Sequence, residues 1–476
     1  MFKKLISSLV LVSLICLAIL LFAWWMFHNP VKTFSRSLPG MDNSGKGALV
    51  PGEAVRIGDS FSFFNTSREI PGASWPRFRG PDFDNINKET TRLINSWGTT
   101  GPEIRWKINL GEGHAAPAVY NGRIYILDYD EQKKADALRC FSLDSGEELW
   151  RRWYHVHLKR NHGLSRTIPA VNEKYVVTIG PRCQVMCVDR ITGNLRWGID
   201  LAKEYNSEVP FWYTGQCPLI DNDTAVIATG GNSLMIGIDC RSGKKVWETP
   251  NPHQWKMSHS SIMPMTFGGK KMYVYFAIGG VCGISANGPD KGKSLWESVA
   301  FSPSVVAPSP VILDNGKIFF SAGYGAGSML MQIKENNGQF QAEVLQKYKA
   351  VDGLASEQQT PVFYKDHLFA ILPKDAGNAR NQFVCCTSCD CMKFVMTSGK
   401  TERFGLGPYL LADGKFYILN DDGELIIAEA SFRQFKVLDR RKIIDGQDAW
   451  GPLVITGGYL LMRDSKQMVC LDIKAK

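Results

Sequence analysis

Six residues able to bind charged or planar groups lie within a dozen residues before a recurring proline. A guanidinium binds carboxylates, carboxylates hold hard divalent ions such as calcium, and an indole offers a flat stacking surface. Loops carry binding groups more often than strands do. We expect these side chains to line one face of the fold, as a ligand site or as loop residues facing water or a partner: Arg166, Trp212, Trp255, Glu357, Asp448 and Trp450.

Four cysteines fall within seven residues, at Cys385, Cys386, Cys389 and Cys391. Zinc favours thiolate ligands at short spacing, but four ligands this close together are sterically awkward. A disulfide and an irregular hairpin tip are the other interpretations, and the sequence leaves all three open. Asp390 stands where a c-type haem motif has histidine, which argues against haem attachment.

Histidines cluster at His155, His157 and His162. Alternate residues of a strand face one way, so the first two are at a spacing that could hold copper or zinc. No carboxylate or thiolate is near them in sequence, so we favour a solvated polar loop. His114, His253 and His259 precede other repeats and can join these residues only in three dimensions.

Eight prolines set the frame for these residues, because each one heads a short apolar run. Successive prolines are 44 to 52 residues apart. Self-similarity at a period of about 40 to 50 residues predicts a repeat architecture. The prolines are Pro117, Pro169, Pro218, Pro264, Pro310, Pro361, Pro408 and Pro452.

Each repeat predicts four antiparallel strands. Two-residue hairpin signals such as Asn121-Gly122, Asn315-Gly316 and Asp413-Gly414 join the first strand to the second. Between the third and fourth strands, a glycine precedes a tryptophan by four residues. Four antiparallel strands per repeat make a propeller blade, with the tryptophan on the outermost strand. The signature occurs at Gly146 and Trp150, Gly193 and Trp197, Gly243 and Trp247, and Gly292 and Trp296.

The two ends of the repeat region predict a closed ring. After Pro452 there is room for only three strands, and Ile104–Ile108, which carries Trp106, supplies a fourth. Pairing of these terminal strands removes exposed sheet edges. The predicted fold is therefore an all-β, eight-bladed β-propeller closed by its N- and C-terminal strands.

Other cysteines fall at matching third-strand positions, at Cys140, Cys187 and Cys470, where Gly237 and Gly283 stand in two other repeats. Small residues there predict tight packing between sheets, because a free cysteine behaves as a small buried hydrophobe. The chain beyond residue 28, which we expect to be exported, holds 11 cysteines. Because this number is odd, at least one of them should remain unpaired.

The first 28 residues predict a transmembrane signal anchor. Leu5–Phe27 is uncharged, follows Lys3 and Lys4, and carries Trp24 and Trp25 near its far end. Basic residues stay on the cytoplasmic side, so we expect the inner (cytoplasmic) membrane, with the propeller on the periplasmic side. A cleaved signal peptide is the alternative. Residues 29–74 predict a flexible linker, and residues 75–476 the propeller.

The formal charge of +9 is scattered along the chain, whereas nucleic-acid binding needs a clustered basic stripe. We therefore expect no nucleic-acid partner. The expected molecule is a monomeric propeller.

The runs Cys187–Trp197 and Ile238–Trp247 resemble the PQQ-type propeller repeat. Trp75–Pro81 is similar to the opening segment of bacterial PQQ-like propellers. The family includes quinoprotein alcohol dehydrogenases and BamB, an assembly scaffold of the outer membrane. The resemblance covers about residues 75–476 and implies the fold more strongly than an activity.

A quinoprotein dehydrogenase, by the same resemblance, would hold PQQ and calcium over the central channel, with a catalytic aspartate and a vicinal disulfide. No stretch matches the family's calcium or base motif, so no role is transferred to a residue. Cys385 and Cys386 are adjacent, but they fall in the third strand and the turn after it, on the face opposite the candidate loops.

We therefore predict a noncatalytic binding or scaffold protein of the cell envelope, with an envelope protein or a polysaccharide as partner. A PQQ-dependent oxidoreductase acting on alcohols or sugars is one alternative. A polysaccharide- or peptide-binding propeller is another. No cofactor is assigned.

Overall fold

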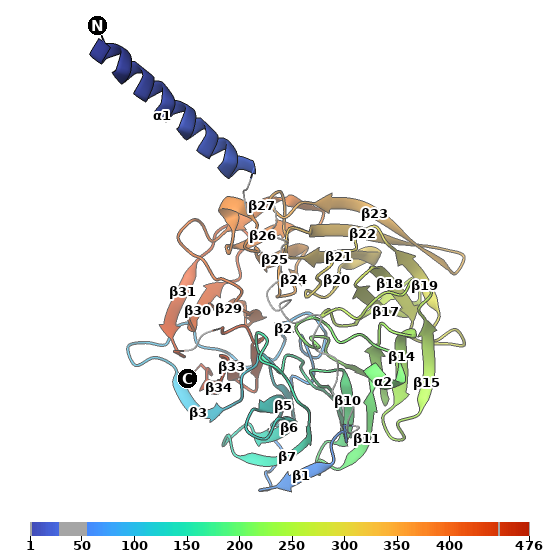
Figure 1. The fold of residues 1–476 in the computed structure, drawn as a ribbon. Helices are drawn as coiled ribbons and strands as arrows, with labels where there is room; N and C mark the ends of the chain where they lie inside the picture. The colour runs from blue at the N-terminus through green and yellow to red at the C-terminus, as the bar shows by residue number, and fades with distance from the viewer. Residues whose placement is uncertain (1, 28–54, 446–447, 476) are drawn as a thin grey trace. The chain divides into compact units, whose positions relative to one another are not determined.

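The repeats fold into eight antiparallel sheets arranged as the blades of a propeller (Figure 1). The computed structural model describes residues 2–27, 55–445 and 448–475. The chain divides into one unit up to Glu53 and a second from Ala54 to Lys476. The second unit holds all the blades, and the predicted all-β eight-bladed fold is confirmed.

The first unit contains helix α1, Phe2–Phe27. Within the described residues, no helix meets the length and apolarity expected of a membrane span. Most of the predicted linker lies outside the described residues. From Val55 onward the chain is part of the propeller unit.

Each blade begins immediately after, or around, its repeat proline, and the strands then run outward in chain order. Blade 1 comprises β4 (Ala118–Tyr120), β5 (Arg123–Asp130), β6 (Ala135–Ser142) and β7 (Glu148–His155), and blade 2 comprises β8 (Ala170–Val171), β9 (Tyr175–Ile179), β10 (Gln184–Asp189) and β11 (Leu195–Asp200). Blade 3 comprises β12 (Leu219–Asp221), β13 (Thr224–Ala228), β14 (Ser233–Asp239) and β15 (Lys245–Pro250). Blade 4 comprises β16 (Met263–Phe267), β17 (Lys270–Ala277), β18 (Gly280–Ser285) and β19 (Ser294–Ser298).

Blades 5 to 8 follow the same order, except that the outermost strand of blade 8 comes from the start of the propeller. Blade 5 comprises β20 (Val311–Ile312), β21 (Lys317–Ala322), β22 (Gly327–Asn336) and β23 (Gln339–Tyr348), and blade 6 comprises β24 (Val362–Tyr364), β25 (His367–Ile371), β26 (Phe383–Thr387) and β27 (Asp390–Thr397). Blade 7 comprises β28 (Tyr409–Ala412), β29 (Lys415–Leu419), β30 (Glu424–Glu429) and β31 (Val437–Lys442). Blade 8 comprises β32 (Val454–Thr456), β33 (Tyr459–Arg463), β34 (Gln467–Asp472) and β3 (Glu103–Asn109).

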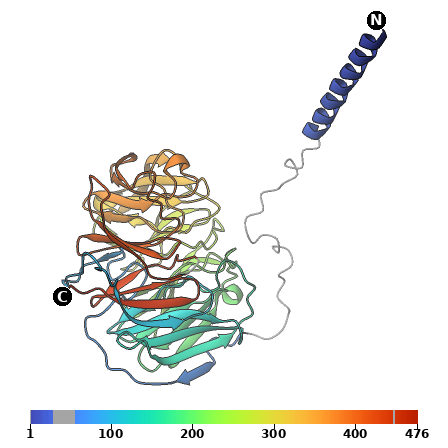
Figure 2. The same cartoon turned by 90° about the vertical axis from the view of Figure 1, so that its left-hand side faces the viewer.

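Ring closure is confirmed in blade 8. Strand β3 pairs antiparallel with β34, and Trp106 lies opposite Cys470. The red strands of blade 8 lie beside cyan β3 in Figures 1 and 2. Pairing of the two ends leaves no open gap in the ring, which limits edge-to-edge association.

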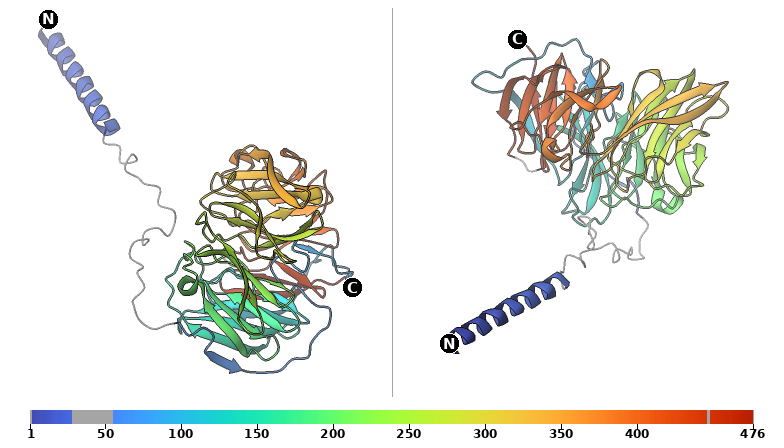
Figure 3. Two further views of the ribbon diagram at one scale, coloured as in Figure 1. Left: turned by 90° about the vertical axis from the view of Figure 1, so that its right-hand side faces the viewer. Right: turned by 90° about the horizontal axis from the view of Figure 1, so that it is seen from above.

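The hydrophobic core lies between adjacent blades, which pack face to face around the ring (Figure 3). Between blades 4 and 5, for example, Phe276 packs with Ile318 and Phe320 in one buried cluster. The signature tryptophans cover these seams as predicted: the indole of Trp197 in blade 2 donates to the carbonyl of Cys240 in blade 3 over 2.9 Å. The indole of Trp106 in blade 8 likewise donates to the carbonyl of Leu143 in blade 1 over 2.9 Å.

Two short strands from before the first blade extend two of the sheets. β1 (Ser60–Phe63), from the region predicted as linker, pairs with the outer edge of β7. β2 (Ile86–Asn87) pairs in parallel with the inner edge of β28, and Figure 1 shows it near the middle of the ring.

The segment Trp75–Asn87 crosses the axis of the propeller. Trp75 bridges to Val119 in blade 1, and the guanidinium of Arg79 donates to the carbonyls of Thr360 and Pro361 beside blade 6, each over 2.9 Å. The amide of Asn87 reaches the carbonyl of Ile455 in blade 8 over 2.7 Å. The segment thereby ties distant innermost strands together.

Candidate functional site

The loops that precede the repeat prolines emerge on one face of the propeller, which we call the proline face. The hairpins between the second and third strands of each blade turn on the same face. The hairpins between the first and second strands turn on the opposite face, which we call the hairpin face. The charged and aromatic groups described next all belong to the proline face.

Arg166 lies in the loop between β7 and β8, three residues before Pro169. Its guanidinium donates to the main-chain carbonyls of His162 and, over 3.3 Å, Asn161. Its Nε atom is buried and has no hydrogen-bond partner. Burial lowers the pKa of Arg166 to about 10. Among the salt bridges of the described residues, none involves Arg166, so this cation lacks a carboxylate partner.

Two histidines lie within the electrostatic reach of Arg166. Burial, and then the positive charge of Arg166, lowers the pKa of both His114 and His259 to about 3. Arg463 adds to this effect on His114. Both rings are therefore neutral at pH 7 and present one donor and one acceptor nitrogen each. The Nδ1 atom of His114 is buried without a partner.

Each of these histidines belongs to an aromatic group. His114 stacks on Trp450 with ring centroids 4.9 Å apart and an interplanar angle of 29°. His259 lies 6.0 Å from Trp212, measured between ring centroids. Trp212 in turn stacks on Tyr324, from the β21–β22 hairpin, at 5.8 Å and 19°. The cation therefore has flat apolar surfaces beside both neighbouring histidines.

Glycines make room for the two histidines. A Cβ atom at Gly163 would come 2.7 Å from Nε2 of His114, and one at Gly215 would come 2.7 Å from Nδ1 of His259. Gly163 also adopts a positive φ of 82°, which most side chains disfavour. The loop sequences thus hold both rings in fixed positions.

Two carboxylates lie on the same face. Burial raises the pKa of Glu357, and the ammonium of Lys374, 3.9 Å away, opposes the rise. Burial also raises the pKa of Asp421, although its Oδ1 accepts hydrogen bonds from the Leu406 amide over 2.9 Å and from the Trp450 indole over 3.0 Å. These contacts position Trp450 rather than neutralise Arg166.

The structure brings together three of the six predicted residues, Arg166, Trp212 and Trp450, around His114, His259 and Tyr324. Glu357 is nearby, because its charge acts on Tyr324. Asp448 is exposed, and its carbonyl accepts the amide of Trp450 over 2.8 Å.

Trp255 is placed differently from the other five. It is buried, stacks on His253 at a centroid distance of 5.3 Å and covers Gly279 and Gly280 at the β17–β18 turn. This packing fills a gap above blade 4. Its ring stacks on His253 rather than on the aromatic groups beside Arg166, so its place in the fold is structural.

Sequence reasoning singled out the two histidines only as neighbours of repeat prolines, and it missed Tyr324 and Asp421. These last two lie in hairpins between second and third strands, and Gly323 and Gly325 flank Tyr324. Turn sequences of this kind predict a hairpin, but they do not tell which side chain extends over the axis.

The donor groups do not form a metal site within the described part of the chain. No group of three or more histidine, cysteine or acidic side chains comes together there. This applies to the cluster of four cysteines and to His155, whose Nδ1 lies 3.0 Å from the carbonyl of Lys133. Calcium, which needs six or more oxygen ligands, therefore finds no carboxylate set that fits it.

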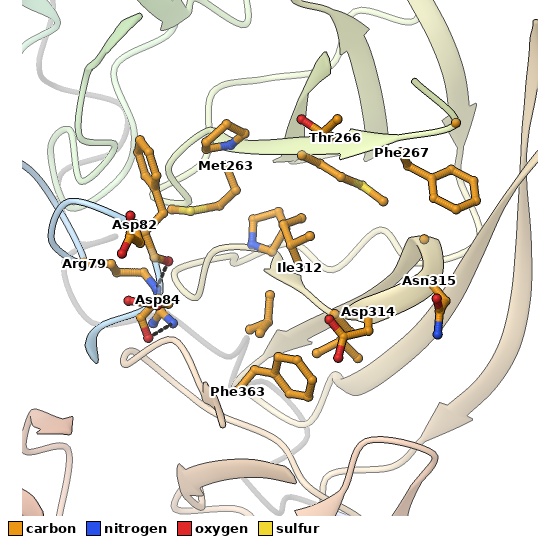
Figure 4. A pocket seen from close by; sticks show the side chains of 18 of the residues that line it. Arg79, Asp82, Asp84, Met263, Thr266, Phe267, Ile312, Asp314, Asn315 and Phe363 are labelled. Carbon is orange, nitrogen blue, oxygen red and sulfur yellow. Dashed lines mark hydrogen bonds between the residues drawn. The ribbon is translucent and has the colours of Figure 1, made fainter. Parts of the chain in front are cut away.

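A pocket of about 630 Å³ opens on the hairpin face, where the β16–β17 hairpin of blade 4 meets the β20–β21 hairpin of blade 5. Its walls are about equally polar and apolar, and the apolar part includes Met263, Ile312 and Phe363. Figure 4 shows Arg79 and Asp84 at one edge and Asn315 at the other. The hydrogen bonds of Arg79 to Phe83 and Asp84 carbonyls fix the edge, so the residues there are structural.

Comparison with solved structures places the fold among PQQ-like propellers. BamB from Moraxella catarrhalis has a TM-score of 0.52 at 12% identity, over 78% of this chain and 100% of its own. A europium-containing methanol dehydrogenase has a TM-score of 0.56 at 12% identity, over 83% and 89%. The quinohemoprotein alcohol dehydrogenase from Comamonas testosteroni has a TM-score of 0.55 at 9% identity, over 85% and 81%. At such identities the likeness concerns the fold alone.

No curated protein matches the sequence significantly. A family model described as outer membrane protein assembly factor BamB matches residues 134–381, which is more than half of the chain. The match spans blades 2 to 5 in full, with parts of blades 1 and 6. The chain belongs to this family of PQQ-like β-propellers.

Proposed function

We propose that this protein is a noncatalytic binding protein of the cell envelope, and that the proline face holds an anionic group of its partner at Arg166. The observation that carries the proposal is the buried guanidinium nitrogen without a counter-ion, set between aromatic groups. A carboxylate offers two acceptor oxygens to a guanidinium.

Electrostatics favours this function. Burying a charge costs several kcal/mol unless a partner compensates for it. An arriving carboxylate would compensate for Arg166, while the neutral rings of His114 and His259 add no competing charge. The indoles of Trp212 and Trp450 would cover an apolar or aromatic part of the same partner.

The partner proposed is another envelope protein. The family description as an outer-membrane assembly factor supports a role in protein assembly. A side-chain or terminal carboxylate next to an aromatic residue is the feature that would fit the site. A polysaccharide partner is tested as the alternative in the experiment below.

We also propose that residues 1–28 tether the propeller to the inner membrane, with the propeller on the periplasmic side. The support comes from the uncharged run Leu5–Phe27, the preceding Lys3 and Lys4, and Trp24 and Trp25 near its end. Fractionation of cells that express the full chain, followed by protease treatment of spheroplasts, tests this placement.

A PQQ-dependent oxidoreductase is the second candidate function. Arg166 and the indoles of Trp212 and Trp450 suit a planar, multiply charged quinone. A calcium ion and a vicinal disulfide fit less well, because no carboxylate set converges among the described residues and because Cys385 and Cys386 face opposite sides of β26. We therefore derive no catalytic step through the cofactor.

Calorimetry on the full-length protein tests the anion site, with sodium benzoate as a carboxylate probe. Benzoate should bind the wild type and raise its melting temperature, because a ligand of the folded form stabilises it. Arg166→Gln should lose at least tenfold in affinity. Arg160→Gln is the matched control, because Arg160 lies in the same loop with its side chain 82% exposed. Equal benzoate affinity in all three proteins would refute the site.

The same samples decide between the candidate functions. PQQ with calcium and a panel of alcohols should give no dye reduction; alcohol-dependent reduction would replace the binding proposal with the enzyme. An envelope extract passed over wild-type protein should yield a bound protein that Arg166→Gln does not retain. Retention of polysaccharide instead would assign the third function.

A further inference from the structure

The vicinal cysteines of blade 6 belong to different cores. Cys385 and Cys386 are consecutive residues of β26, so their side chains point to opposite faces of the sheet. Cys385 packs in the buried cluster shared with blade 7, beside Phe416. Cys386 packs in the cluster shared with blade 5, beside Leu330. This alternation separates the two thiols.

A different cysteine lies next to Cys386. Strands β26 and β27 are joined by a tight turn in which Thr387 pairs with Asp390. The register then shifts, so that Cys386 lies opposite Phe394 and Cys391 falls in the irregular stretch between these two pairs. The side chains of Cys386 and Cys391 interact with each other, and both are fully buried in the same cluster.

Blade 6 also lacks the tryptophan that anchors an outermost strand. Cys385 pairs with Met396, at the position where Cys187 pairs with Trp197 in blade 2. The side chains of Met392 and Val395 in β27 are 55% and 40% exposed. A covalent link between β26 and β27 would hold this outer strand where the indole is missing.

We propose that Cys386 and Cys391 form a cross-strand disulfide that staples β27 to β26. The oxidant is a disulfide of the thiol–disulfide exchange class, such as glutathione disulfide or an oxidoreductase. One S–S bond of the oxidant breaks and the Cys386–Cys391 bond forms. The two cysteine thiols are oxidised, and the oxidant leaves as two thiols that take up the two protons and two electrons.

The timing of the reaction follows from burial. A thiolate is the attacking species, and burial raises the pKa of the Cys386 thiol well above its ordinary value. The bond therefore forms before blade 6 packs against blade 5. Cys389 is exposed at the turn, beside the Thr387 hydroxyl at 3.5 Å, and is left out of the proposed pair.

Differential alkylation of the full-length protein tests the pairing. Reduced protein is refolded from urea in a glutathione redox buffer, free thiols are blocked with iodoacetamide, and the sample is then reduced and labelled with N-ethylmaleimide. Trypsin cuts after Arg380 and Lys393, which leaves all four clustered cysteines on one peptide. The second label should appear on Cys386 and Cys391 alone. A second label on Cys385, on Cys389, or on none of the four would overturn the proposal.

Variants give a second readout that requires only folded protein. Dithiothreitol should lower the melting temperature of the wild type and of Cys389→Ser, the matched control. It should not change that of Cys386→Ser or Cys391→Ser. An equal shift in all four proteins would assign the redox effect to other cysteines. Because the buffer sets the redox potential, these outcomes do not depend on the proposed periplasmic location of the propeller or on the proposed anion site at Arg166.

Discussion

Gly237 in β14 lies directly opposite Trp247 in β15, and a Cβ atom at Gly237 would come 2.1 Å from Nε1 of the indole. The same relation recurs around the ring. Gly283 faces Trp296, and Cys140 and Cys187 face Trp150 and Trp197. Small residues in the third strand therefore accommodate the seam tryptophan of the same blade. The prediction placed this tight packing between sheets, whereas these contacts lie within one sheet.

Gly237→Ala should destabilise the propeller by about 1–3 kcal/mol, because the added methyl group overpacks a rigid seam. Urea denaturation followed by tryptophan fluorescence measures the change. Cys187→Ala is the matched control at the equivalent position of blade 2, where a Cβ atom is already accommodated. A Gly237→Ala midpoint equal to that of the wild type would mean that the indole moves aside at no cost.

Blade positions were predictable because they depend on short-range chemistry. A proline at or beside the start of each innermost strand, a glycine in several hairpin turns and, in four repeats, a tryptophan four residues after a glycine act within one repeat. The closing strand was predictable as well, since Trp106 carries the same seam position as Trp197. These features need no knowledge of the neighbouring blades.

The candidate site was less predictable, because it depends on long loops. Trp212 and Trp255 both precede a repeat proline, yet one stacks on Tyr324 and the other covers Gly279. Loop length and local packing decide where each tryptophan side chain lies. The spacing of the repeat prolines carries no information about either. Similarly, β1 becomes a strand only because β7 offers it an edge to pair with.

The two histidines beside Arg166 predict a loss of stability in acid. Burial and the charge of Arg166 lower the pKa of His114 and of His259 from the ordinary value of 6.5 to about 3 in the folded protein. Below about pH 6.5 these two histidines are therefore protonated in the unfolded chain but stay neutral in the folded protein. The free energy of unfolding consequently falls as pH falls toward 3. Each histidine contributes up to about 1.4 kcal/mol per pH unit.

Arg166→Gln should make this acid dependence shallower, because removing the nearby cation raises the folded pKa of both rings. Urea midpoints measured from pH 7 to pH 4 give the slope, with Arg160→Gln as the control that keeps the wild-type slope. A slope unchanged by Arg166→Gln would show that burial alone depresses the two pKa values.

A buried carboxyl predicts the opposite sign in blade 1. Burial raises the pKa of Asp136 from 3.8 to about 7, and its Oδ2 accepts the hydroxyl of Tyr154 over 2.8 Å. The folded protein holds a proton that the unfolded chain releases, so this stabilisation is present below pH 3.8 and is lost as pH rises through 7.

Asp136→Asn should therefore gain stability relative to the wild type as pH rises from 4 to 7, and the gain should stay constant above 7. The amide keeps the acceptor for Tyr154 and carries no charge to bury. The difference in urea midpoint across this range measures it, and Asp130→Asn, near the exposed β5–β6 turn, is the control. A difference independent of pH would mean that Asp136 is ionised in the folded protein throughout.

Closure of the ring predicts that the last three strands are essential to cooperative folding. Truncation after Trp450 removes β32, β33 and β34, so Trp106 in β3 loses Cys470 and its whole partner strand. Blades 1 and 7 would then each expose an apolar face, because their shared core includes Leu461 and Val469. Calorimetry should show the cooperative transition abolished. Truncation after Ile473 keeps all three strands and is the control, whose transition should persist; a sharp transition without the three strands would refute closure as the source of cooperativity.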